Sequence, residues 1–207
     1  MFKSLFGAVS IASVMAWCVF FLGSFYYVSN NHSQIYAEDG LIENIQASFL
    51  AIACLVYLAV AVLDKQAKTL ILLFCSLLCY GFVLRELDVE KLNVPSAIKF
   101  MGSGVGRNAS VGAAFAAILI YMGFSGFTRH VKTAVAFFKV KSGALLLVAA
   151  VFLFVGEFFE KQTEMAFHVF YEEMFELLGY VFILLSSLSV VPFLNRVGSR
   201  SNERVTG

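Results

Sequence analysis

The chain has 207 residues, of which 60% are hydrophobic and only 14% are charged. Soluble domains carry about 25% charged residues, so this composition excludes an ordinary soluble fold and indicates a protein embedded in lipid. The apolar runs are continuous and the chain has only two prolines, which favours spanning helices over the short alternating strands of a membrane barrel. The sequence therefore predicts an all-α, polytopic membrane helix bundle.

Six apolar stretches approach the length that crosses a hydrocarbon core of about 30 Å at about 1.5 Å per residue. They define a single transmembrane domain with helices at roughly 5–28, 41–63, 69–84, 109–128, 142–159 and 168–194. The first run is longer than that of a signal peptide and no small-residue cleavage site follows it before Tyr26, so a retained helix is expected. The third would cover only about 24 Å, which draws Arg85 toward the hydrocarbon.

Charged residues are divided unevenly between the two ends of the predicted helices. With a cytoplasmic N-terminus, ten of the fifteen Lys and Arg residues lie in cytoplasmic segments, which agrees with the positive-inside rule. Twelve of the fourteen Asp and Glu residues then lie on the outer side. The charges therefore predict that both ends of the chain are cytoplasmic, an N-in/C-in topology.

Two further segments have a distinctive composition. Residues 128–141 place basic residues around the apolar run Ala134–Phe138, which is typical of a short interfacial helix against anionic inner-leaflet lipid. Membrane lipids are therefore expected partners, and no feature predicts nucleic-acid binding. The stretch 109–128 carries small residues four apart, such as Gly112 and Ala116. Because such residues let helix backbones approach closely, this helix is expected to pack centrally.

A polar network is predicted at the outer end of the bundle, where three helices bring acidic side chains to the same level. Its members are Glu43, Gln46, Arg85, Glu86, Asp88, His168, Glu172, Glu173 and Glu176. An unpaired charge in the bilayer is costly, so Arg85 is expected to be held by carboxylates from this set. The simplest interpretation is a structural clamp between the second, third and sixth helices.

Functional interpretations of this network stay open. One is a cation or proton site, in which a desolvated carboxylate changes its protonation. Another is recognition of a cationic ligand at the outer surface. A third is a metal site, for which His168, Glu172 and Glu176 are weak candidates because they lie at four-residue spacing. The paired Glu-x-x-His motifs of bundle di-metal sites are missing, and no motif predicts a cofactor.

Three short motifs carry a resemblance to other membrane proteins. They are Glu38-Asp39-Gly40 followed by Glu43, then Arg85-Glu86 followed by Asp88, and Glu172-Glu173 followed by Glu176. With the helical layout, they resemble a loosely defined group of bacterial six-span inner-membrane proteins. The resemblance implies a multi-pass protein of a bacterial inner membrane and brings no known activity.

Two classes of function remain. The first is a non-enzymatic channel, transport or signalling subunit that uses the outer network, which the short loops favour. The second is a membrane-embedded enzyme acting on a lipid-like substrate, either metal-dependent or not, in which His168, Glu172 and Glu176 are metal ligands or acid/base groups. A homo-oligomer or a partner subunit is compatible with the small size of the bundle.

Overall fold

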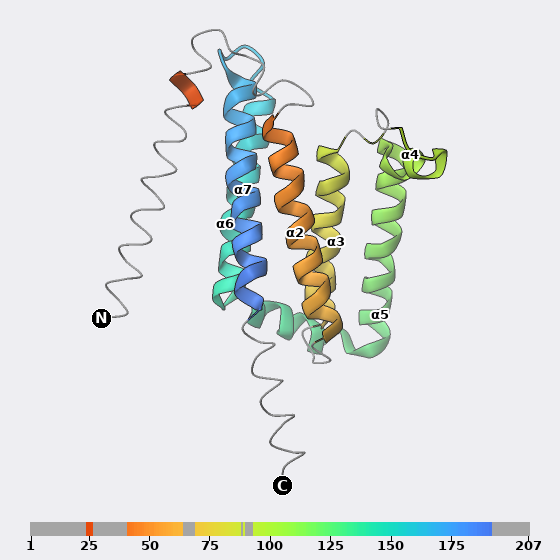
Figure 1. The fold of residues 1–207 in the computed structure, drawn as a ribbon. Helices are drawn as coiled ribbons and strands as arrows, with labels where there is room; N and C mark the ends of the chain where they lie inside the picture. The colour runs from red at the N-terminus through yellow and green to blue at the C-terminus, as the bar shows by residue number, and fades with distance from the viewer. Residues whose placement is uncertain (1–23, 27–40, 64–68, 88, 90–92, 192–207) are drawn as a thin grey trace, which may run out of the picture.

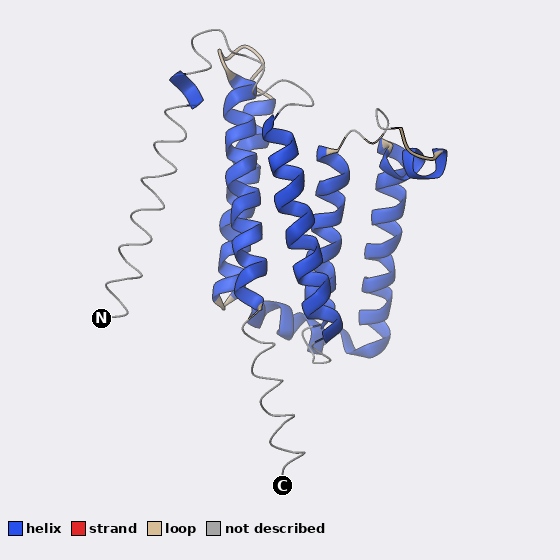
Figure 2. Cartoon of the chain, viewed as in Figure 1, coloured by secondary structure: helices blue, strands red, loops and turns tan. Residues whose placement is uncertain are grey.

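The computed structural model describes residues 24–26, 41–63, 69–87, 89 and 93–191. Every regular element in these ranges is a helix (Figure 2). The predicted span 5–28 lies outside the described residues except for 24–26, which are helical. Five helices in the described part are long and apolar enough to cross a membrane. The protein is therefore a multi-pass helical membrane protein.

The spanning helices are α2 (Leu41–Leu63), α3 (Thr69–Glu86), α5 (Gly104–Phe138), α6 (Lys141–Glu160) and α7 (His168–Val190), and a short helix α4 (Ser96–Gly102) precedes α5. Four of the spanning helices begin and end within four residues of the predicted apolar runs, whereas α5 extends well beyond the predicted 109–128 at both ends. Helix α3 is two residues longer than its apolar run and, with 18 residues, covers about 27 Å. Residues 192–194 of the predicted last helix lie outside the described part.

The helices pack side by side in the order α6, α7, α2, α3, α5 (Figure 1). The core lies mainly between α2, α3 and α7, because each presents an apolar face there. On α2 that face runs through Leu50, Ala53, Tyr57 and Val60, which recur at helical spacing and are fully buried or nearly so. Burial of such a stripe drives the packing of an amphipathic face against its neighbours.

Helix α5 does not pack centrally, which corrects the prediction for the stretch 109–128. It lies at the edge of the row, contacts α3 along its spanning part and contacts the short helix α4 near its start (Figure 1). Its small residues Gly112 and Ala116 are exposed. Small residues permit a close helix contact but do not by themselves create one.

Helix α5 changes direction at Gly126, whose φ of 105° and ψ of 79° are not helical. Glycine adopts a positive φ at no steric cost, whereas a side chain would strain the backbone there. Beyond it, residues 127–138, here called the elbow segment, run across the lower end of the bundle toward α6 (Figure 1). The predicted interfacial segment is thus helical, and its place at a membrane surface remains a prediction.

Candidate functional site

The end of α3 carries an ion pair with α7. The guanidinium Nη2 of Arg85 donates to Oε1 of Glu176 at 2.7 Å, and its Nε lies 4.0 Å from Oε1 of Glu86. The two carboxylate side chains are only 4% and 6% exposed, whereas that of Arg85 is 42% exposed. The partly exposed guanidinium of Arg85 therefore forms ion pairs with two buried carboxylates.

A second polar contact joins the first turns of α2 to α7. The side chain of Gln46 is fully buried, and its Nε2 donates to the backbone carbonyl of Glu173 at 3.1 Å and to Oε2 of the same residue at 3.0 Å. Among the described residues, Oε1 of Gln46 is buried and accepts no hydrogen bond. If the side-chain amide of Gln46 were reversed, Oε1 would face the backbone carbonyl and the carboxylate of Glu173, which are both acceptors. The reversed Oε1 would gain a hydrogen bond only if the Glu173 carboxyl group carried a proton.

Tyr180 lies one turn deeper than Glu176 on α7 and contacts one of the two buried carboxylates, that of Glu86. Its hydroxyl donates to Oε1 of Glu86 at 2.7 Å, and the ring is fully buried. Together these six residues are called the Arg85 network below. Its members are Gln46, Arg85, Glu86, Glu173, Glu176 and Tyr180.

Helix α6 makes room for Glu176 by carrying a glycine opposite it. A Cβ atom on Gly156 would lie 3.0 Å from Cγ of Glu176 and 3.4 Å from the backbone oxygen of Glu172. The missing side chain lets α6 and α7 approach at the level of the ion pair. Nothing in the sequence marked Gly156, because its role depends on which helix faces α7.

The other predicted members lie around the Arg85 network. Glu43 and Glu172 are partly buried, and Asp88 lies outside the described residues. The Nδ1 atom of His168 is 3.1 Å from the carbonyl oxygen of Met165, so this ring is held by the turn before α7. In the described ranges, no three His, Cys, Asp or Glu residues are placed to hold a metal ion. The weak candidates His168, Glu172 and Glu176 therefore do not form a ligand set.

A separate group of hydrogen bonds lies deeper in the core. The hydroxyls of Tyr57 and Ser186 are 2.6 Å apart, and that of Ser186 donates to the carbonyl of Ser142 at 2.7 Å. Buried apolar side chains such as Ile183 lie along α7 between this group and Tyr180. The Arg85 network thus ends at Tyr180 instead of continuing as a polar path along α7.

No protein-family model, curated protein or solved structure matches this chain. The class of protein therefore rests on the fold itself, which is that of a multi-pass helical membrane protein. The resemblance to bacterial six-span proteins gains no support from these comparisons and stays a prediction.

Proposed function

We propose that this protein is a non-enzymatic channel, transport or signalling subunit whose Arg85 network takes up a proton or a small monovalent cation. The observation that carries the proposal is the buried Oε1 of Gln46, which lacks a hydrogen-bond donor beside a carboxylate. A buried acceptor without a partner costs about 1–3 kcal/mol. A bound cation, or a proton on Glu173 together with reversal of the Gln46 amide, would supply the missing partner.

The balance of charge supports the same proposal. The carboxylates of Glu86, Glu173 and Glu176 lie close enough to one another to interact electrostatically. Arg85 is the only guanidinium ion-paired with any of them among the described residues. An uncompensated buried charge costs several kcal/mol. The excess of negative charge is therefore offset by a proton or a cation.

The finer topology is part of the proposal: six spans, N-in/C-in, in a bacterial inner membrane. The ring of Phe25 lies 5.9 Å from that of Phe170 and 6.3 Å from that of Tyr171, near the start of α7. This contact supports a first span that ends at the upper end of Figure 1, beside the Arg85 network. The basic residues Arg129 and Lys132 at the opposite end support a cytoplasmic lower end.

The alternative of a metal-dependent enzyme acting on a lipid-like substrate draws no support from the described residues. Its candidates His168, Glu172 and Glu176 do not converge with a further ligand, and the His168 ring is engaged with a backbone carbonyl. A non-enzymatic role fits the Arg85 network better, because its groups neutralise charge and are not arranged around an open coordination position.

Cation binding is tested by the stability of the purified full-length protein in detergent. The free energy of unfolding is measured in Na⁺, K⁺ or Li⁺ salts against choline at equal ionic strength. A cation that binds only the folded state adds about 2.7 kcal/mol at one hundred times its Kd. We expect Glu173→Gln to abolish this gain and Glu157→Gln to retain it, because Glu157 pairs with Lys161 outside the network.

Transport is then distinguished from signalling in proteoliposomes. Fluxes of H⁺, Na⁺ and K⁺ are followed for the wild type, Glu173→Gln and Glu157→Gln. A flux that is lost only in Glu173→Gln supports a channel or transporter. Binding without flux supports a signalling subunit. A wild type that neither responds to these cations nor holds a carboxyl proton would refute the proposal.

A further inference from the structure

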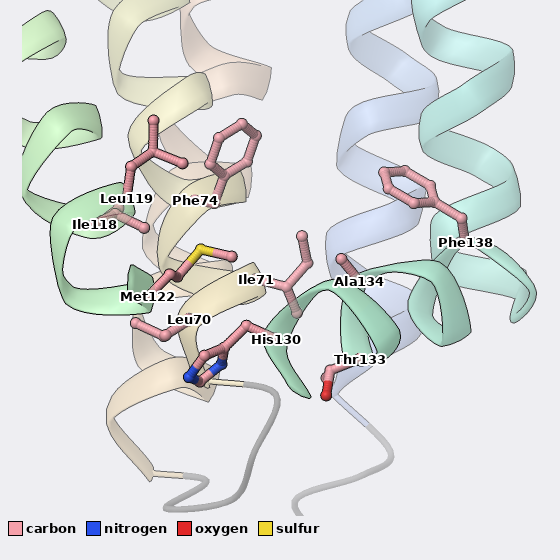
Figure 3. Close-up of a pocket in the computed structure, with 10 residues that line it drawn as sticks. All are labelled: Leu70, Ile71, Phe74, Ile118, Leu119, Met122, His130, Thr133, Ala134 and Phe138. Carbon is pink, nitrogen blue, oxygen red and sulfur yellow. The ribbon is translucent and has the colours of Figure 1, made fainter. Parts of the chain in front are cut away.

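An apolar cavity of about 320 Å³ lies at the lower end of the bundle, where the elbow segment passes beneath α3 and α5 (Figure 3). Its walls come from α3 (Leu70, Phe74), from the spanning part of α5 (Ile118, Met122) and from the elbow segment (Ala134, Phe138). The exposed surface of the lining is almost wholly apolar, and the cavity is partly open. Its volume falls at the lower end of the range for small-molecule sites.

The elbow segment is held in place by one hydrogen bond across the bend and by burial at its far end. The hydroxyl of Ser125 donates to the carbonyl oxygen of Tyr121 at 2.7 Å and lies 2.9 Å from Nε2 of His130. At the far end, Phe137 is buried. These contacts fix the elbow segment at both ends, so the cavity is a built feature of the fold.

The faces of the elbow segment differ sharply in chemistry. His130, Thr133, Ala134 and Phe137 recur at helical spacing and are the least exposed residues of the segment. Phe127, Val131, Val135 and Phe138 form an exposed apolar stripe beside them. The cations Arg129, Lys132 and Lys139 occupy the remaining face and are all exposed. A helix with this pattern lies in the headgroup layer with its cations toward anionic lipid.

Charge complementarity identifies the occupant of the cavity. The stretch 91–156 contains no Asp or Glu, although it contains seven Lys and Arg residues. Four of these lie on the elbow segment (Arg129 and Lys132), directly after it (Lys139) or at the start of α6 (Lys141). Basic pockets between spanning helices on the cytoplasmic side bind the headgroups of anionic lipids. An acyl chain matches the apolar lining, and a phosphate matches Arg129 and Lys132, which lie within one turn of the lining residue Thr133.

We propose that this cavity binds one acyl chain of an anionic phospholipid, whose phosphate is held by Arg129 and Lys132. A partly open cavity of about 320 Å³ has room for part of one chain, and the second chain remains in the bilayer. The proposal is independent of the Arg85 network, which lies at the opposite end of the bundle (Figure 1). It assigns the elbow segment a lipid-binding role that is selective for headgroup charge.

The test is native mass spectrometry of the full-length protein in detergent with two lipids at equal concentration. The probes are palmitoyl-oleoyl phosphatidylglycerol and the phosphatidylcholine with the same chains. A surface cation contributes roughly a fivefold preference for anionic lipid, so the double variant Arg129→Gln/Lys132→Gln should reduce the phosphatidylglycerol preference by about 30-fold. The preference of the wild type should also weaken as salt is added.

Filling the cavity tests the acyl-chain half of the proposal. Ala134→Phe places a ring in the cavity and should lower the occupancy of both lipids. Ala113→Phe, on an exposed face nearer the start of α5, should retain the wild-type occupancy, and Lys99→Gln in α4 should retain the wild-type headgroup preference. Equal retention of the two lipids by the wild type, or equal lipid binding by the two phenylalanine variants, would overturn the proposal. A dimer that Ala134→Phe disrupts without loss of lipid would also overturn it, because a second copy would then be the occupant.

Discussion

Replacing Gly156 by alanine perturbs the contact between α6 and α7 at the level of the ion pair. The added Cβ would lie 3.0 Å from Cγ of Glu176, which is closer than ordinary van der Waals contact, and 3.4 Å from the Glu172 backbone oxygen. Overpacking of this kind costs about 1–3 kcal/mol, and alanine recovers about 0.8–1.0 kcal/mol of helix propensity. The expected net loss of stability is about 0–2 kcal/mol.

Gly112→Ala is the matched control, because a Cβ at Gly112 has no neighbour within 4 Å. This variant gains the same helix propensity without overpacking. The difference in unfolding free energy between the two variants should therefore be about 1–3 kcal/mol, with Gly156→Ala the less stable. Equilibrium unfolding in mixed detergent micelles measures this difference. If both variants are stabilised equally, the close approach of α6 to Glu176 is refuted.

Two further predictions concern the bend and the inner hydrogen bonds. Gly126→Ala should destabilise the protein by about 1–2 kcal/mol in a thermal unfolding assay, because its φ of 105° strains any residue with a side chain. The added Cβ would meet no atom within 4 Å, so backbone strain is the whole effect. Gly123→Ala should be neutral or stabilising in the same assay. The hydroxyls of Tyr57 and Ser186 are 2.6 Å apart. A double-mutant cycle on Tyr57→Phe and Ser186→Ala should therefore give a coupling free energy of about 0.6 kcal/mol. A coupling of zero would contradict this hydrogen bond.

The positions of the helices along the chain were predictable because apolar run length is a strong signal in a membrane protein. The run 41–63 coincides with α2, and α7 begins at the predicted His168. The bend at Gly126 was not predictable, since the apolar run continues past it to Phe127. The error in placing α5 centrally has a similar origin, because the sequence of one helix does not reveal its neighbours.

The candidate site was predictable as a set of residues but not as a set of contacts. Helical spacing shows that Glu172 and Glu176 share one side of α7, and the cost of a lone charge in lipid predicts a partner for Arg85. Which carboxylate becomes that partner depends on the packing order α7, α2, α3 in space. The bond between Gln46 and Glu173 depends on the same order, so neither contact follows from the spacing within one helix.

The most direct test of the central claim is an infrared difference measurement on the carboxyl groups of the Arg85 network. In choline buffer at neutral pH, no small metal cation is present to balance the excess carboxylates, so a proton must do so. The wild type and Glu157→Gln should then show the carbonyl stretch of a protonated carboxylic acid, shifted in D₂O, and Glu173→Gln should lack it. Absence of this band from the wild type, or its persistence unchanged in Glu173→Gln, would contradict the account.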